Sequence, residues 1–441
     1  MELTFDYIKI RIFKMYSKFG LDAELDKNRK ITDLNSVYRI KLVKPVDLVS
    51  SFYEYGCNFY KAAHTIASYL LETENTNIAQ LDTYFFSLAF LYRHSIELIL
   101  KALAFRNIPE NDKRATFAKD TFHDLEKILD KLLKLEPNMR KQQEIDWLKN
   151  YFADISKMDK ESDSFRYPFH IHRTPADLFC GAKYSLERVF EEQTHIDLCK
   201  FANKFEATYE ILNLWYLKDE KSANEWKELK PVFIETGGSY YGQAVVGYGY
   251  TRWDFYPYIN AYTETAGYLR MCMTKFYDDS DISAATDLFI PMCYLYRNAV
   301  ELLLKASWFE EVREDFQNRC KILNKKKHKV VGLWNKLRCW MKEYFGEETE
   351  ETNYFDEIEV CCNTLHNFDT DASIFRYPCK KDMQVYFMKD VTLDFLNVAE
   401  FMESLINSID NIYYELSYRN DYINEAEAEM RAEMEGEYRN E

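Results

Sequence analysis

The most regularly spaced charged residues form two matching sets of arginine, glutamate and lysine. Arg93, Glu97 and Lys101 are four residues apart within the stretch 91–102, and the pattern returns 204 residues later within 295–306. Eight of the twelve positions are identical in the two stretches. The second set consists of Arg297, Glu301 and Lys305. Because residues four apart share one face of a helix, each set can hold a carboxylate between two cations.

Two interpretations of these sets are open. An exposed ladder of this spacing contributes only about 0.3 to 0.5 kcal/mol per ion pair to a helix, so it is easily replaced. Its presence in both stretches favours either a buried structural network or residues that support a functional site.

The second repeated motif is the tetrapeptide Phe-Arg-Tyr-Pro, which occurs at 165–168 and at 375–378, each time after an acidic loop. Arg166 and Arg376 therefore stand between two aromatic residues on a loop that a proline restricts. A guanidinium held in this way can bind phosphate or carboxylate. Alternatively, each arginine pairs with the glutamate of its own half and closes a helical bundle.

Histidines beside the first tetrapeptide supply a candidate acid or base. His172 follows Arg166 with five residues between them, and His170 is close by. An imidazole titrates near neutral pH and can take or give a proton, while an arginine can stabilise charge on a phosphate. Arg166, His172 and His170 are therefore the catalytic candidates. The second tetrapeptide is followed by Cys-Lys-Lys-Asp without a histidine, in a segment that is about fifteen residues shorter.

Two further histidines precede predicted helices. His123 and His328 occupy these positions, which are typical of capping or packing residues. The run Lys325–Lys329 contains His328 and is the densest basic segment of the chain. It is either a solvated loop or a guide for RNA.

Composition and charge limit the classes of protein that fit. The chain has 441 residues, 47% hydrophobic content and only 12 glycines and 9 prolines, which favours long helices in a globular protein. A formal net charge of −16 argues against a protein that coats nucleic acid non-specifically. The ten cysteines include no CxxC pair, so we expect neither a zinc site nor a disulfide framework, and reduced thiols in a cytoplasmic protein. No cofactor is expected.

The sequence divides into five segments. We expect a leader with some β-structure, two helical units, a connector rich in glycine and tyrosine with a hairpin or ordered loop, and an acidic tail: 1–45, 46–218, 219–252, 253–418 and 419–441. Alternating residues predict strands at 4–15 and 37–43. Helices are predicted at 78–105, 177–192 and 196–217, among others. No uninterrupted apolar run of about 18 residues occurs, so no membrane span is expected.

The combined motifs resemble the HEPN-like helical domains of prokaryotes. The resemblance rests on Arg-x3-Glu-x3-Lys in a long helix, a histidine before the next helix and a downstream Phe-Arg-Tyr-Pro, and it covers both helical units. It implies a mostly α fold of two bundles of four or five helices, packed as an intramolecular pseudo-dimer, with Arg376 contributing across the interface. The family's Arg-x4-6-His motif maps onto Arg166 and His172. Tyr167 and Pro168 depart from the polar residue that usually follows that arginine.

The resemblance also implies a function. Many members are metal-independent endoribonucleases of antiviral defence or toxin–antitoxin systems, which cleave RNA by attack of the 2′-hydroxyl and leave a 2′,3′-cyclic phosphate. RNA is then the expected substrate, with an antitoxin, another defence-system protein or a second copy of the chain as further partners. The alternative is a non-catalytic module of the same family that binds a nucleotide or a partner protein. The missing histidine in the second unit favours that alternative.

Overall fold

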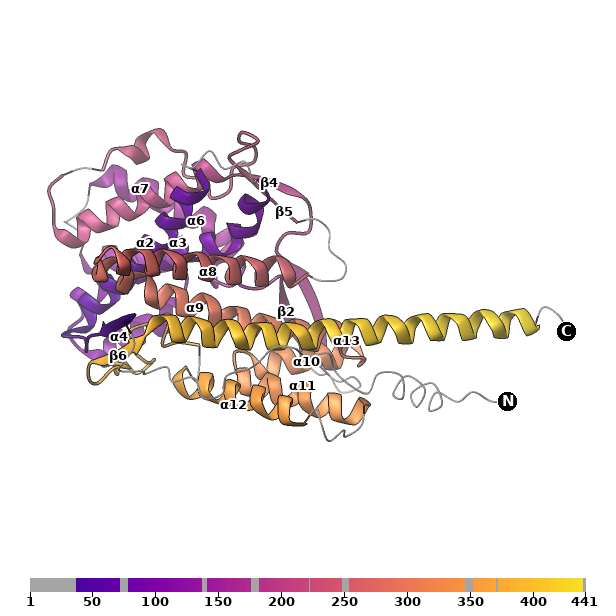
Figure 1. Ribbon diagram of the computed structural model, residues 1–441. Helices are drawn as coiled ribbons and strands as arrows, with labels where there is room; N and C mark the ends of the chain where they lie inside the picture. The colour runs from indigo at the N-terminus through magenta and orange to yellow at the C-terminus, as the bar shows by residue number, and fades with distance from the viewer. Residues whose placement is uncertain are drawn as a thin grey trace.

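The chain folds mainly into helices, as the scarcity of glycine and proline predicted (Figure 1). The computed structural model describes residues 37–71, 78–136, 141–175, 182–221, 223–247, 254–345, 352–369 and 372–438. The strand predicted at 4–15 lies outside these residues. Within the described ranges, no helix has both the length and the apolar character needed to cross a membrane.

The first half of the chain contains six α-helices among its described residues and one short 3-10 turn. They are α2 (Leu48–Leu71), α3 (Ala79–Arg106), α4 (Asn111–Thr121), α5 (Leu125–Leu135), α6 (Gln142–Asp159), α7 (Leu198–Leu217) and the turn η1 (Glu225–Glu228). The described residues of the second half follow a similar order and end in a much longer helix. They form α8 (Tyr256–Asp278), α9 (Ile282–Ala306), the π-helical turn η2 (Ser307–Glu311), α10 (Phe316–Lys326), α11 (Val330–Phe345), α12 (Thr352–Phe368) and α13 (Phe395–Tyr438).

Helices α3 and α9 form the centre of the molecule. Every residue from Tyr84 to Phe105 in α3 is buried, and so is every residue from Leu288 to Ala306 in α9. A helix buried on all sides needs apolar residues around its whole circumference, and both helices have them. Helix α3 packs against α2, α7 and α8, while α9 packs against α8, α2 and α13. The two halves thus share one core, and the charged residues within 84–105 of α3 and within 288–306 of α9 lie inside it.

Three short antiparallel pairs of strands complete the described fold. Strand β1 (Arg39–Leu42) pairs with β6 (Val391–Asp394), β2 (Phe169–Thr174) with β3 (Lys183–Arg188), and β4 (Thr194–Asp197) with β5 (Gln243–Val246). The strand predicted at 37–43 is therefore present, and it pairs with the strand that leads into α13. Likewise, the connector contributes strand β5, which pairs with β4, the strand that precedes α7.

The helix predicted at 177–192 is wrong. Its described part contains β3, which forms a hairpin with β2. The hairpin register pairs Phe169 with Arg188 and Thr174 with Lys183. Side chains from Lys183 to Glu187 alternate between exposed and half-buried, with a period of two and not of 3.6. This hairpin accounts for the extra residues that follow the first tetrapeptide.

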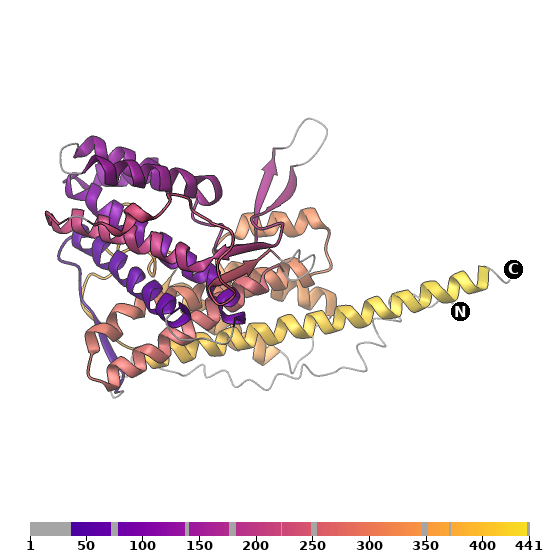
Figure 2. The same cartoon turned by 90° about the horizontal axis from the view of Figure 1, so that it is seen from above.

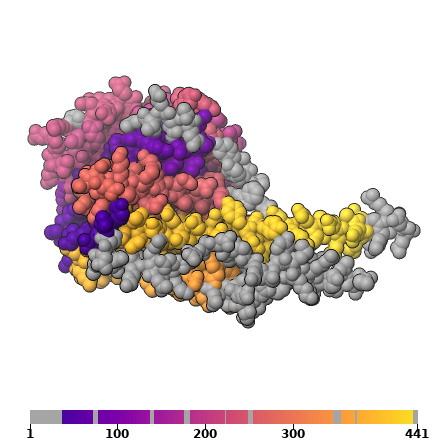
Figure 3. Space-filling view, in the orientation of Figure 1, coloured from indigo at the N-terminus to yellow at the C-terminus, as the bar shows by residue number. Residues whose placement is uncertain are grey.

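Helix α13 continues far beyond the core. Its first part packs on α9 and α8, and its C-terminal part extends away from the body of the molecule (Figure 2). In the space-filling view, α13 crosses the face below α8 and then projects past it (Figure 3). The described part of the acidic tail is thus helical, and its side chains from Arg431 to Glu435 are exposed.

Candidate functional site

Glu97 is the centre of a buried polar cluster in the first half. Its side chain has no solvent exposure, and both of its carboxylate oxygens have cationic partners. Nη1 of Arg93 lies 2.7 Å from Oε2, and Nζ of Lys101 lies 2.7 Å from Oε1. Nε of Arg93 also lies 2.9 Å from Oδ2 of the buried Asp159 at the end of α6. The spacing of four residues along α3 thus places three charges on one face, and the apolar helix buries them.

His123 joins this cluster from the turn between α4 and α5. Its Nδ1 lies 3.0 Å from Oε1 of Glu97, and its main-chain carbonyl accepts a hydrogen bond from Arg93. Because a carboxylate only accepts hydrogen bonds, Nδ1 must carry the hydrogen, which leaves Nε2 as the basic nitrogen of the neutral ring. Phe122, just before it, has a φ of 47° and a ψ of −112°, a strained conformation for a residue with a side chain.

Glu301 is the centre of the corresponding cluster in the second half. Nζ of Lys305 and Nδ1 of His328 lie 2.7 Å and 3.0 Å from its Oε1, and Arg297 pairs with its Oε2. Nε of Arg297 lies 3.1 Å from Oδ2 of Asp369. The residue before this histidine, Lys327, has a φ of 49° and a ψ of −111°. The two halves therefore hold their histidines with the same contacts and the same unusual backbone.

A tyrosine of the opposite half completes each cluster. Tyr377, in the second tetrapeptide, donates a hydrogen bond of 2.8 Å to Oε1 of Glu97. Tyr167, in the first tetrapeptide, donates one of 2.7 Å to Oε1 of Glu301. Each hydroxyl also lies within 3.2 Å of Nδ1 of the histidine in the cluster it joins. We call the two clusters the Glu97 centre and the Glu301 centre, and each of them contains residues from both halves. The Glu97 centre consists of Arg93, Glu97, Lys101, His123 and Tyr377, and the Glu301 centre of Arg297, Glu301, Lys305, His328 and Tyr167.

The arginines of the two tetrapeptides approach the same aromatic ring, that of Phe90. Arg166 and Arg376 are both buried, and the guanidinium carbons lie 5.9 Å and 6.0 Å from the ring of Phe90. Each donates a hydrogen bond to the hydroxyl of the tyrosine that follows it, at 2.9 Å from Arg166 and 3.4 Å from Arg376. The alternative in which each arginine pairs with the glutamate of its own half is therefore wrong. It is the following tyrosine that contacts a glutamate, and that glutamate belongs to the other half.

Electrostatics keep both glutamates ionised. Burial alone would raise the pKa of Glu97, but Lys101, His123 and Arg93 hold that pKa well below its usual range. Glu301 behaves in the same way, because Lys305, His328 and Arg297 surround it and lower its pKa. Both carboxylates are therefore charged at neutral pH.

The histidines are neutral in the folded protein. Burial lowers the pKa of His123 to about 4, against the opposing effect of Glu97. Glu301 raises the pKa of His328, but burial and the charges of Lys305 and Arg166 outweigh that effect and lower it below its ordinary value. About a quarter of the His123 side chain and 38% of the His328 side chain remain accessible to solvent. In the part of the chain that the structure describes, neither Nε2 has a hydrogen-bond partner.

The histidines predicted as catalytic lie elsewhere. His172 is on β2, where its Nε2 lies 2.6 Å from Oε2 of Glu187 across the hairpin, and its side chain is more than half exposed. His170 lies 3.4 Å from Oδ2 of Asp163, and this contact raises its pKa. Arg166 is buried and, among the described residues, forms neither a hydrogen bond nor an ion pair with His170 or His172. The structure therefore groups Arg93, Glu97 and Lys101 with His123, and does not group Arg166 with His172.

Sequence reasoning missed the histidines and tyrosines of the two centres. The positions of His123 and His328 predict only capping or packing roles, and Tyr167 stands out only as a departure from the family pattern. The signal that identifies them was present, because both histidines precede corresponding helices and both tyrosines occur in the repeated tetrapeptide. Repetition at matching places was thus a better guide than the spacing between Arg166 and His172.

No family model matches this sequence, and searches of curated proteins and of solved structures found no match. Among the described residues, no group of three or more histidine, cysteine, aspartate or glutamate side chains is arranged to hold a metal ion.

Proposed function

We propose that the protein is a metal-independent endoribonuclease whose proton transfers are carried out at the Glu97 and Glu301 centres. One observation carries the proposal. In both centres, a fully buried carboxylate fixes Nδ1 of a histidine at 3.0 Å, so that Nε2 is the basic atom and has no described partner. A carboxylate that orients an imidazole in this way defines its tautomer, which is what a general base requires.

We further infer that the two halves are tandem HEPN-like bundles packed as an intramolecular pseudo-dimer. Several pairs of equivalent contacts support this inference. Tyr92 donates to Glu206 and Tyr296 to Glu403, each between the central helix and the last helix of its half. In both halves, an aspartate caps that last helix after a short strand. The reciprocal exchange of the tetrapeptide tyrosines is the contact expected about a two-fold axis.

The chemistry follows from the groups at each centre. Nε2 of His123 or His328 would take the proton of a ribose 2′-hydroxyl, whose oxygen then attacks the adjacent phosphorus and expels the 5′-oxygen of the next nucleotide. The protonated imidazole then returns the proton, directly or through water, to that leaving oxygen, which becomes a 5′-hydroxyl. Lys101 and Lys305 are paired with the glutamates inside the core. The charge that develops on the phosphate oxygens would therefore be stabilised by exposed lysines beside His328, such as Lys327 and Lys329. A pKa near 4 makes His123 a weak base in the free protein, but the negative charge of a bound phosphodiester raises the pKa of a nearby imidazole. The product is a 2′,3′-cyclic phosphate.

The Glu301 centre is the better placed of the two for RNA. His328 lies within the basic run Lys325–Lys329, of which Lys325, Lys327 and Lys329 are exposed. Clustered lysines bind phosphates without regard to sequence, and they concentrate the substrate beside the imidazole. The sequence has no histidine after Arg376 in the second unit. In this proposal His328, which precedes α11, takes the role of the base there.

The resemblance to HEPN-like domains supports the same activity. It would place the enzyme among the effectors of prokaryotic antiviral defence or toxin–antitoxin systems, with RNA as substrate and an antitoxin or another defence-system protein as partner. The alternative is a non-catalytic module that binds a nucleotide or a partner protein. One observation favours this alternative. Both carboxylate oxygens of Glu97 already have partners within the protein, so the buried network can be explained without a substrate.

The test is RNA cleavage in EDTA with a labelled oligoribonucleotide, read by the chemical nature of the new ends. We expect 2′,3′-cyclic phosphate ends from the wild type and a loss of at least about a hundredfold in rate for the double variant His123→Gln, His328→Gln. The matched control is His172→Gln, an exposed histidine paired with a glutamate on the hairpin.

The outcomes separate the alternatives. Cleavage that survives in the double variant but is lost in His172→Gln and Arg166→Ala would return the active site to the pair predicted from the sequence. No cleavage by the wild type on any RNA, with His123→Gln and His328→Gln altering only stability, would support the non-catalytic module. A substrate with 2′-deoxyribose at the cleavage position must resist the wild-type enzyme.

A further inference from the structure

Four unpaired lysines lead along α10 to the Glu301 centre. Lys321 and Lys325 are four residues apart and share one face of the helix, while Lys327 and Lys329 flank His328. All four side chains are exposed, and among the residues that the structure describes none of them forms an ion pair with a carboxylate. We call these four residues the lysine stripe. It concentrates positive charge in a chain whose net charge is −16.

The corresponding helix of the first half has no such stripe. Helices α4 and α10 both contain 11 residues and end at the two residues with the same unusual backbone, Phe122 and Lys327. Counted from the histidine of each centre, the four lysine positions hold residues without positive charge in the first half: Thr116, Asp120, Phe122 and Asp124. This helix and turn therefore do not require lysines. The helix macrodipole does not explain Lys321, because it favours cations only in the last turn.

The lysines beside the Glu97 centre have a carboxylate among them. Lys131 pairs with Asp120 at 2.7 Å, and this contact, together with the nearby charges of Lys119 and Lys127, lowers the pKa of Asp120. A phosphate that approaches the Glu97 centre therefore meets cations that are partly neutralised. The two centres thus have similar buried contacts and differ in the charge around them.

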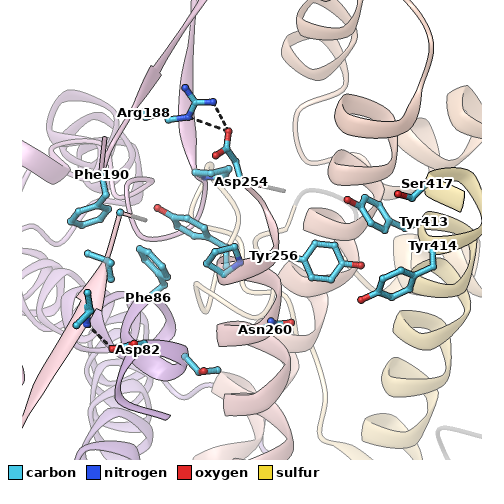
Figure 4. Close-up of a pocket in the computed structure, with 17 residues that line it drawn as sticks. Asp82, Phe86, Arg188, Phe190, Asp254, Tyr256, Asn260, Tyr413, Tyr414 and Ser417 are labelled. Carbon is cyan, nitrogen blue, oxygen red and sulfur yellow. Dashed lines mark hydrogen bonds and ion pairs between the residues drawn. The ribbon is translucent and has the colours of Figure 1, made fainter. Parts of the chain in front are cut away.

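The β2–β3 hairpin of the first half contacts the start of the same helix, α10. The main-chain N–H of Tyr184 donates to Oε1 of Gln317 at 2.7 Å, and Nε2 of Gln317 donates to the carbonyl of Tyr184 at 3.0 Å. At the base of the hairpin, Arg188 binds Oδ2 of Asp254 through two nitrogen atoms, at 2.8 Å and 3.1 Å (Figure 4). These contacts fix the hairpin on the second half. Gln317 is four residues before Lys321, so the hairpin meets the helix face that carries the stripe.

An arginine and an aromatic ring lie at this hairpin end of α10. Arg173 is exposed and pairs with Tyr184 across the hairpin, so the two side chains project from one face. Phe316, next to Gln317, is 36% exposed. Cations in a row beside an exposed ring are a combination that binds single-stranded nucleic acid, because the cations contact successive phosphates and the ring stacks on an unpaired base.

We propose that the lysine stripe, Arg173 and Phe316 form a surface for single-stranded RNA that leads to the Glu301 centre and makes it the principal site of cleavage. The inference rests on the proposed ribonuclease activity and adds the form of the substrate and the centre that receives it. Gln317 and Lys325 are about 12 Å apart along the axis of α10, and His328 follows at the end of this surface.

Fluorescence anisotropy of the full chain with a labelled, 2′-O-methylated single strand tests the surface, because this probe lacks the attacking hydroxyl and stays intact. We expect Lys321→Gln, Lys325→Gln to bind the probe at least about tenfold more weakly and with a smaller dependence on salt, since phosphate contacts are lost. The matched control is Lys119→Gln, Lys127→Gln, which removes the same charge from exposed positions near the Glu97 centre and should bind as the wild type does. Circular dichroism establishes that both double variants retain the fold.

Cleavage of an unmodified single strand then compares the two centres. We expect the loss of rate in His328→Gln to exceed that in His123→Gln at least about tenfold. Equal binding by the two double variants, binding of a duplex as tight as that of the single strand, or equal losses in the two histidine variants would overturn the proposal. Selective binding without cleavage of any RNA would instead support the surface and reject the ribonuclease activity.

Discussion

Glu97 and Glu301 carry a full charge at positions without solvent exposure, and their surroundings explain how the fold tolerates this. Each carboxylate receives an arginine, a lysine, a histidine and a tyrosine. Taking a charge out of water costs several kcal/mol, so such a network is stable only while all of its members are present. The same completeness gives each histidine a single orientation.

Glu97→Gln is expected to destabilise the fold by about 3 to 5 kcal/mol, because Lys101 then remains buried without a counter-charge. Urea denaturation measures the loss. The control is Lys113→Gln, which breaks an ion pair of 3.0 Å between Lys113 and Glu110 that is largely exposed, and it should leave the free energy of unfolding unchanged. Equal losses in the two variants would show that burial does not govern the Glu97 pair.

His123 should make the stability depend on pH. Its pKa is about 4 in the folded protein and about 6.5 in the unfolded chain, so the unfolded chain binds the extra proton between these values. Stability contributed by neutral His123 is thus complete above pH 6.5 and is lost as pH falls towards 4. Denaturation midpoints of the wild type and His123→Gln at several pH values are the measurement, and the variant should lose less stability over this range. Parallel pH profiles would contradict the assignment.

At the scale of the element, the turn before each histidine is the part that the fold holds under strain. Phe122 and Lys327 share the same positive φ and strongly negative ψ, although neither is a glycine. Strain of this kind costs about 1 to 3 kcal/mol and persists only where surrounding contacts impose it. Here those contacts are the arginines that bind the carbonyls of His123 and His328.

Lys327→Gly should therefore raise the free energy of unfolding by about 1 kcal/mol, because glycine adopts this backbone without steric cost. Lys325→Gly provides a control with the same loss of charge. Lys325 is an exposed residue within α10, where glycine is expected to lower stability by about 1 kcal/mol. Guanidinium denaturation of both variants gives the comparison. Destabilisation by Lys327→Gly would mean that its side chain has a role that outweighs the strain.

The elements that the sequence predicted best are those with a strong local signal. The long helix that contains Arg93, Glu97 and Lys101 was predicted at 78–105 and is present as α3, and the four-residue spacing correctly placed the three side chains together. The helix predicted at 177–192 is absent because the residues from Lys183 to Glu187 alternate with the period of a strand, a pattern too short to stand out in the sequence. The sequence also could not predict which strands pair with each other, since β1 pairs with β6, about 350 residues away.

At the scale of the whole molecule, the sequence could not predict that each tetrapeptide tyrosine binds the glutamate of the opposite half. Tyr167 lies in one copy of the repeated tetrapeptide. Glu97 and Glu301 lie in closely similar local sequences, so either glutamate could be its partner. A pairing within one half and a pairing across halves therefore have identical sequence patterns. The choice is made by the packing of α3 against α8 and of α2 against α9, which brings each tetrapeptide to the opposite centre.

The exchange predicts that a substitution in one half changes the histidine of the other. Tyr167→Phe removes the hydroxyl that donates 2.7 Å to Glu301, so more of the negative charge of Glu301 acts on His328 and the pKa of His328 should rise. The pKa of His123 should stay unchanged, because Tyr377 still donates to Glu97. Histidine titration by NMR resolves both rings, and Tyr377→Phe is the matched control, expected to raise the pKa of His123 and leave that of His328 as it was. If Tyr167→Phe instead alters His123, each half builds its centre from its own tyrosine, and the two centres are not shared.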